Sequence, residues 1–140
     1  MIKLSDLLFG ISIKSVVGDI TSVMVNKVEF DSRKVSDSDL FIAINGVTVD
    51  GHSFISTSIE KGAKSVIVEE IPEKINEDIC YVQVDSASSS MSVVASNYYD
   101  NPSTKIKLVG VTGTNGKTTI VTLLHQIFSD LGYPTGMLST

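Results

Sequence analysis

The chain has 140 residues, of which 42% are hydrophobic and 19% charged, as in an ordinary soluble globular protein. Its formal net charge of −5 argues against a general nucleic-acid surface, because such surfaces hold phosphate with clustered Lys and Arg. No apolar run approaches the length of a membrane helix and no secretory leader pattern opens the chain, so we expect a cytoplasmic protein without nucleic-acid or membrane partners.

Strand and helix patterns alternate from residue 5 to residue 98. Short apolar runs predict strands over 23–30, 40–44, 66–68 and 79–84, and apolar periodicity predicts helices over 5–8 and 53–61. A further helix follows a run of serines that offers N-cap oxygens, and its apolar stripe is Met91, Val94, Ala95 and Tyr98. The single cysteine, Cys80, is expected to be a buried thiol without a disulfide.

An Asn-Pro-Ser sequence at residues 101–103 breaks the last of these helices and predicts a junction between domains. We therefore expect one domain over residues 1–103 and the start of a second over residues 104–140. Beyond the junction, residues 106–112 predict a strand, and Met137 is expected to begin another.

A glycine-rich turn that ends in Gly-Lys-Thr follows the strand predicted over 106–112. Gly110, Gly113 and Gly116 allow backbone N–H groups to approach phosphate oxygens closely. Lys117 adds a positive charge for the outer phosphates, and the Thr118 hydroxyl is placed to ligate magnesium. An amphipathic helix comes next, and its positive N-terminal end would face the same anion. The apolar positions of that helix are Ile120, Leu123, Leu124, Ile127, Phe128 and Leu131.

The turn departs from the strict Walker A pattern at one position. That pattern has a glycine five positions before Gly116, where this chain has Val111. A glycine-rich strand-to-helix turn with a surface lysine is the alternative interpretation. The order of strand, glycines, Lys-Thr and helix favours a nucleoside triphosphate site.

The turn at residues 112–119, Thr-Gly-Thr-Asn-Gly-Lys-Thr-Thr, resembles the nucleotide loop of the Mur ligases, which build the peptide stem of bacterial cell-wall precursors. Residues 31–35, 39–46 and 50–55 resemble the N-terminal domain of the MurE type, which acts on UDP-N-acetylmuramoyl-L-Ala-D-Glu. Residues 59–63 and 98–103 fit the same family in the same order.

The resemblance implies an α/β fold. It consists of an N-terminal UDP-binding domain, a mixed sheet with flanking helices, followed by the first strand, P-loop and helix of an ATPase domain. Ligases of this kind are several times longer than this chain, so we expect a fragment that is inactive alone. Leaving the helix stripe after Lys117 in water would forfeit on the order of 10 kcal/mol. We predict that this helix packs on a neighbouring copy or on the first domain, or else that it is poorly ordered.

The resemblance also assigns roles to residues. It implies ATP and Mg²⁺ as cofactors, a catalytic role for Lys117 and a magnesium contact from Thr118. The residues expected to bind ATP are Gly113, Thr114, Asn115, Gly116, Lys117, Thr118 and Thr119. The residues expected to contact the UDP part of the substrate are Phe30, Ser32, Val47, Thr48 and Val49. The partners are UDP-N-acetylmuramoyl-dipeptide and a free amino acid, with meso-diaminopimelate or lysine expected.

Charged and histidine residues near the expected UDP contacts also have structural interpretations. Asp31 and Arg33 flank Ser32, and they either face the ligand or pair with each other to hold the loop. His52 follows Asp50 and Gly51, and we expect it to close a turn and cap the next helix.

Three other functions remain as alternatives. The first is the related Mur ligase that adds D-Ala-D-Ala, although its loop usually reads Gly-Ser-x-Gly-Lys-Thr. The second is a non-catalytic module that binds a UDP-sugar, which would not need the Lys-Thr loop. The third is a nucleotide-switch P-loop protein, which would not need the Asp-Ser-Arg segment.

Overall fold

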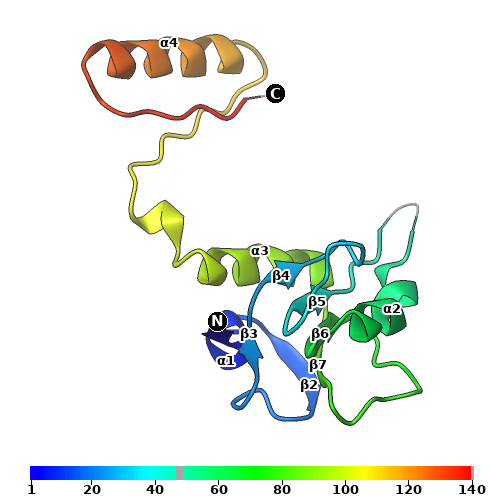
Figure 1. The fold of residues 1–140 in the computed structure, drawn as a ribbon. Helices are drawn as coiled ribbons and strands as arrows, with labels where there is room; N and C mark the ends of the chain where they lie inside the picture. Colours follow the sequence, from blue (N-terminus) through cyan, green and yellow to red (C-terminus); the bar gives the residue numbers. More distant parts are fainter. Residues whose placement is uncertain (47–48, 140) are drawn as a thin grey trace. The chain divides into compact units, whose positions relative to one another are not determined.

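The computed structural model describes residues 1–46 and 49–139, and the chain divides into two compact units, Met1–Pro102 and Ser103–Thr140. The first unit contains a five-stranded sheet in the order β2-β7-β6-β5-β4 (Figure 1). The strands are β2 (Ile13–Val17), β4 (Val28–Glu29), β5 (Leu40–Ile42), β6 (Ser65–Val68) and β7 (Cys80–Val84). Strands β4 to β7 pair in parallel and β2 pairs antiparallel with β7, so the sheet is mixed.

Helices cover the sheet and connect its strands. They are α1 (Leu4–Leu7), the 3-10 turn η1 (Gly51–Phe54), α2 (Ile55–Glu60) and α3 (Ala87–Tyr98). A two-stranded antiparallel ladder of β1 (Ile2–Lys3) and β3 (Met24–Val25) lies beside them. The predicted α/β fold, with a mixed sheet and flanking helices, is confirmed.

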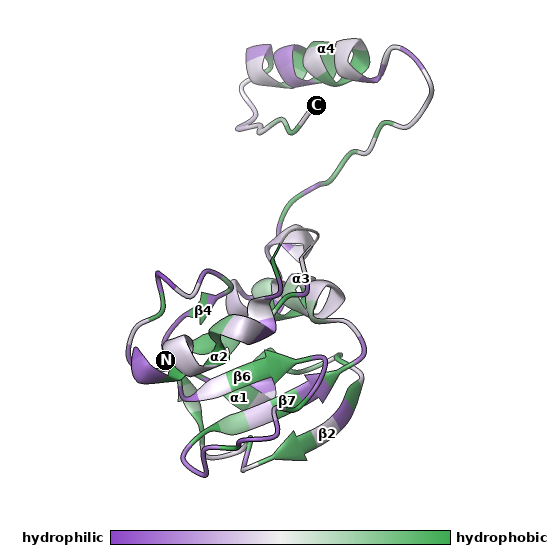
Figure 2. Ribbon diagram, turned by 90° about the vertical axis from the view of Figure 1, so that its right-hand side faces the viewer, coloured by the Kyte–Doolittle hydropathy of each residue, from purple (hydrophilic) through white to green (hydrophobic). Residues whose placement is uncertain are grey.

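The sheet separates two hydrophobic clusters because side chains alternate between the faces of a strand. Leu40 and Ile42 belong to the cluster that also holds residues of α1 and α3. Phe41 and Tyr81 belong to the opposite cluster, which also holds Ile55 of α2. Figure 2 shows the resulting apolar strands of the sheet. A sheet covered on both faces needs such nearly continuous apolar strands.

Cys80 confirms the expectation of a buried thiol. Its side chain is 3% exposed in the cluster with α1 and α3, and it is a free cysteine. Desolvation by burial raises the pKa of this thiol, as expected for a cysteine that acts as a small apolar side chain.

The N-terminal prediction differs from the structure in two places. The strand predicted over 23–30 is two short strands, β3 and β4, which belong to different sheets. Asn26 N–H donates to Ser38 O at 2.8 Å and Lys27 N–H to an Asp39 carboxylate oxygen at 3.0 Å, so the backbone between the strands is bound to a loop. Strand β2 has no counterpart in the prediction, because its edge position leaves it only partly apolar.

The second unit contains one long helix, α4 (Lys117–Asp130). The short 3-10 turn η2 (Pro102–Thr104) lies at the boundary between the two units. The strands predicted over residues 106–112 and from Met137 are wrong: these residues form no strand. A strand is stabilised by hydrogen bonds to a neighbour, and no strand is present among the described residues of this unit.

The apolar stripe of α4 is largely exposed within its unit. The exposed fractions are Ile120 47%, Leu123 53%, Ile127 52%, Phe128 41% and Leu131 66%. The chain after the helix covers it only in part, through an edge-to-face contact between Phe128 and Tyr133. What covers this stripe therefore stays a prediction. Among the described residues, no helix combines the length and apolar character needed to cross a membrane.

Candidate nucleotide-binding sites

The glycine loop of the second unit leads directly into the N-terminus of α4. Gly116 has φ +77° and immediately precedes the helix, and Gly113 has φ +151°. A Cβ built on Gly116 would meet nothing within 4 Å, so the backbone angle and not crowding requires glycine there. Ile120 N–H donates to Gly116 O at 3.0 Å. The N–H groups of a first helical turn before that bond have no intrahelical acceptor and can bind an anion.

Lys117 lies across this loop. Its Nζ donates to Gly113 O at 2.7 Å and lies 3.4 Å from Thr114 O. The amine therefore sits on the loop that the sequence predicts to hold phosphate. A phosphate oxygen is a stronger acceptor for an ammonium group than a neutral carbonyl, so these contacts are replaceable.

Thr118 occupies the first turn of α4, beside Lys117. Its Oγ1 accepts from Ser139 Oγ at 3.4 Å, and its carbonyl accepts from Thr122 Oγ1 at 2.8 Å. No cluster of three or more His, Cys, Asp or Glu suited to a metal occurs among the described residues. A hydroxyl in this position fits Mg²⁺ only as one ligand among phosphate and water oxygens, which is the usual environment of that ion.

The residues predicted to bind UDP do not line one common pocket. Phe30 is 62% exposed and lines an open groove of about 610 Å³ between β4 and α3. Ser32 and Val49 are not part of its wall. Val47 and Thr48 lie outside the described residues. The prediction for this set therefore stays a prediction.

The same groove contains aromatic residues that the sequence reasoning did not assign to a site. Tyr98 and Tyr99 lie in its wall, with ring centroids 5.1 Å apart in an edge-to-face arrangement. Tyr98 Oη donates to Asn26 O at 2.9 Å, which joins α3 to the segment before β4. The helical spacing of Tyr98 indicated a core position, and no pattern in the sequence pointed to the groove.

Asp31 and Arg33 form a pair that holds the loop around Ser32. Asp31 Oδ1 accepts from Arg33 N–H at 3.0 Å and Nε at 2.9 Å, and Asp31 Oδ2 accepts from Arg33 Nη2 at 2.8 Å. Hydrogen bonds from the Arg33 side chain and then its backbone lower the pKa of Asp31 to about 2. Of the two interpretations of these charges, the loop-holding pair is the one the structure shows.

A buried carboxylate, that of Asp39, holds the same segment through hydrogen bonds. It is fully buried and accepts from Lys27 N–H at 3.0 Å, Ser36 N–H at 2.9 Å and Ser36 Oγ at 2.9 Å. It thereby ties both ends of the loop that carries Ser32 to the start of β5. The sequence motif contained Asp39, but nothing in the sequence indicated that it would be buried.

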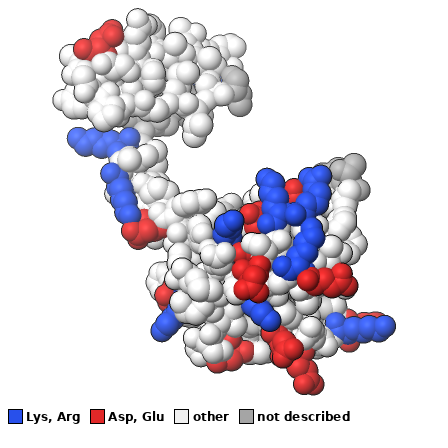
Figure 3. All heavy atoms as spheres, viewed as in Figure 1, with Lys and Arg blue, Asp and Glu red and all other residues white. Residues whose placement is uncertain are grey.

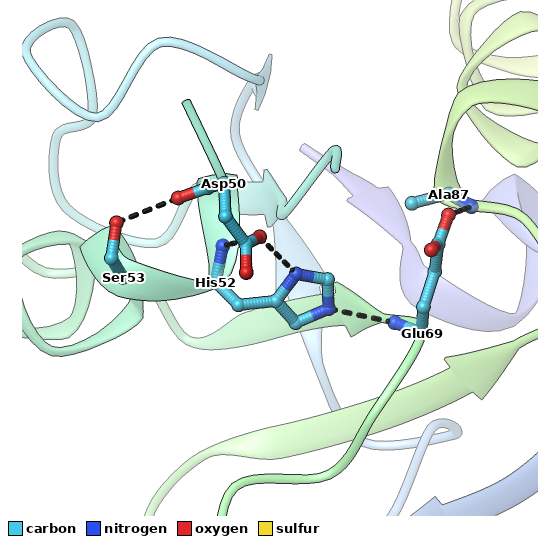
Figure 4. A network of polar contacts seen from close by, with 5 residues as sticks. All are labelled: Asp50, His52, Ser53, Glu69 and Ala87. Atoms are coloured by element: carbon cyan, nitrogen blue, oxygen red, sulfur yellow. Dashed lines mark hydrogen bonds and ion pairs between the residues drawn. The ribbon is translucent and has the colours of Figure 1, made fainter. Parts of the chain in front are cut away.

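His52 is part of a structural network that joins η1 to the carboxyl end of β6 and the start of α3 (Figure 4). Its side chain is 18% exposed, and its Nδ1 lies 2.7 Å from Asp50 Oδ1. Its Nε2 accepts from Glu69 N–H at 3.0 Å, and the Glu69 carboxylate accepts from Ala87 N–H at the start of α3. The cap of η1 is the Asp50 side chain, which accepts from His52 N–H at 2.9 Å, so the expected capping role belongs to Asp50 and not to His52.

The structure is that of an α/β protein in which a glycine-rich loop precedes the N-terminus of a long helix. Residues 24–110 match the family model described as "Mur ligase family, catalytic domain". This match covers more than half of the chain, and the chain belongs to the Mur ligase family, as the resemblance predicted.

A curated relative and two solved structures are similar to the chain. The chain is 52% identical over 139 residues to UDP-N-acetylmuramoyl-L-alanyl-D-glutamate–2,6-diaminopimelate ligase of Cytophaga hutchinsonii, covering 99% of this chain and 28% of that protein. A D-alanyl-D-alanyl ligase structure from Acinetobacter baumannii shares the fold, with TM-score 0.67, 22% identity and coverage of 93% and 28%. The MurF ligase of Thermotoga maritima in complex with ADP has TM-score 0.56 and 28% identity, with coverage of 78% and 24%. The chain thus spans about 28% of the length of the curated relative.

Proposed function

We propose that the chain provides the UDP-binding domain and the phosphate loop of an ATP-dependent, cytoplasmic ligase. This ligase would add 2,6-diaminopimelate to UDP-N-acetylmuramoyl-L-Ala-D-Glu. The observation that carries the proposal is the 52% identity to a 2,6-diaminopimelate ligase over almost the whole chain. The geometry of the glycine loop supports it, because Lys117 and the first turn of α4 adjoin the same loop.

The proposed role of the loop is electrostatic. Bound ATP would transfer its γ-phosphoryl group to an oxygen of the substrate carboxylate with release of ADP. Attack of the incoming amine on that carbonyl carbon would then form the amide bond and release inorganic phosphate. Backbone N–H groups of residues 113–119 would hold the phosphates, and Lys117 Nζ would leave the Gly113 carbonyl to offset charge on the transferring group. Thr118 Oγ1 would contribute one oxygen to Mg²⁺.

The first unit would hold the UDP part of the substrate. Ser32 lies in a loop whose backbone is fixed by the pair of Asp31 and Arg33, and a hydroxyl can both donate to and accept from a uracil or ribose edge. Phe30 is exposed next to this loop and offers an aromatic face. Figure 3 shows a group of Lys and Arg side chains, with Asp and Glu side chains beside it, on the visible face of the first unit, so this face offers cations to an anionic ligand despite the net negative charge.

Turnover by the full-length protein tests the proposal. Formation of ADP is measured with ATP and Mg²⁺ in two assays. The first contains the UDP-dipeptide with diaminopimelate or lysine, and the second contains the UDP-tripeptide that already carries diaminopimelate, with D-Ala-D-Ala. We expect activity with diaminopimelate, and Lys117→Ala should lower turnover by about 100-fold or more while affinity for the UDP-dipeptide stays within about twofold. Lys107→Ala, outside the loop, is the matched control and should retain turnover.

The outcomes separate the proposal from its rivals. Turnover with D-Ala-D-Ala alone would assign the chain to the other ligase type. UDP-dipeptide binding without ADP formation would indicate a binding module. ATP binding without UDP binding would favour a nucleotide switch. Undiminished turnover by Lys117→Ala would show that Lys117 is wrongly assigned.

A further inference from the structure

We infer that Lys61 is a positioning residue for the nucleotide-binding loop around Ser32. This inference rests on the proposed function, because it concerns how Ser32 is presented to the UDP part of the substrate. Lys61 caps the C-terminus of α2, and its Nζ donates to the Ser32 carbonyl oxygen at 2.8 Å across 29 positions of sequence. A long side chain from one element thus holds the backbone of another.

The end of α2 is itself fixed against the segment that follows the loop. Gly62 has φ +109°, and a Cβ on it would lie 2.8 Å from the Asp37 Cα. Ser38 N–H donates to Gly62 O at 2.9 Å. These backbone contacts fix the C-terminal end of α2 against residues 37 and 38. The Lys61 side chain therefore extends toward the Ser32 loop from a restrained backbone position.

Ser32 is held through its backbone and not through its side chain. On one side the Asp31 carboxylate binds Arg33, and Lys34 N–H donates to Asp31 O at 2.9 Å. On the other side Lys61 binds the Ser32 carbonyl. Within residues 1–46 and 49–139 the Ser32 hydroxyl has no hydrogen-bond partner, so it remains available to a ligand. A loop with a restrained backbone and an uncommitted hydroxyl is preorganised for binding.

Two ligands separate positioning from direct contact with phosphate. The test compares UDP and uridine binding to the full-length protein by titration calorimetry, for wild type, Lys61→Met, Lys61→Arg and the control Lys64→Met. Lys64 is exposed and lies three residues further along the chain. We expect Lys61→Met to weaken UDP and uridine by the same factor of about ten, Lys61→Arg to stay within about threefold, and Lys64→Met to bind as wild type.

Kinetics give a second readout that simple loss of stability would not produce. Lys61→Met should raise KM for the UDP-dipeptide about tenfold, while kcat and KM for ATP remain those of wild type. A loss confined to UDP would overturn the inference, because Lys61 would then contact phosphate directly. Unchanged UDP binding by Lys61→Met would also overturn it. Failure of wild type to bind UDP would instead overturn the proposed function itself.

Discussion

The buried carboxylate of Asp39 accepts hydrogen bonds from Lys27 and Ser36, which lie on either side of the Ser32 loop in the sequence. Asp39→Ala would remove the acceptor for two backbone N–H groups and one hydroxyl. A fully buried donor left without an acceptor costs about 1–3 kcal/mol. These donors are only partly buried, so each lies toward the lower end of that range, and we expect the free energy of unfolding to fall by about 3 kcal/mol in total. Asp39→Asn keeps one acceptor oxygen but turns an N–H₂ toward donors, so about half that loss is expected.

Urea unfolding followed by tyrosine fluorescence measures this loss. Tyr81, Tyr98 and Tyr99 lie in the first unit, so the signal reports mainly on that unit. The matched control is Asp37→Ala, two residues away. It removes an exposed carboxylate that accepts from Ser38 Oγ at 3.0 Å, and it should change stability by less than about 0.5 kcal/mol. Equal stabilities of the Asp39→Ala and Asp37→Ala variants would refute the reasoning.

Three further predictions concern other parts of the chain. Since Arg33 lowers the pKa of Asp31 from 3.8 to about 2, the folded state favours the carboxylate; the pair stabilises the protein above about pH 4 and this contribution is lost as the pH falls to about 2. Asp31→Asn should abolish that part of the pH dependence in acid unfolding followed by circular dichroism, and an unchanged acid profile would contradict it. His52→Phe should destabilise the first unit by about 1–3 kcal/mol in urea unfolding, because Glu69 N–H loses its acceptor, and His52→Gln should recover part of the loss. In light scattering we expect the 140-residue chain to self-associate and Leu123→Glu to reduce this, whereas a monomeric wild type would show that α4 is covered in another way.

Local patterns in the sequence were sufficient for the elements of the first unit that carry their own signal. The apolar runs at β5, β6 and β7 and the serine cap of α3 were predicted because strands buried on both faces and capped helices need those residues. The glycine loop was also predicted from local sequence, because a backbone with positive φ, as at Gly116, favours glycine. It missed β2, whose pairing with β7 depends on a partner 68 positions away.

The sequence by itself therefore determined the α/β class, the position of the loop before α4 and the family of the protein, because these depend on short-range spacing and residue type. Only the tertiary structure decided that Asp39 is buried beneath the Ser32 loop, that Asp31 binds Arg33, and that Lys61 reaches the Ser32 carbonyl. It also decided that residues 106–112 form no strand. Such outcomes depend on which distant groups the fold brings within hydrogen-bonding distance, and a strand or a buried charge is stable only where those partners are present.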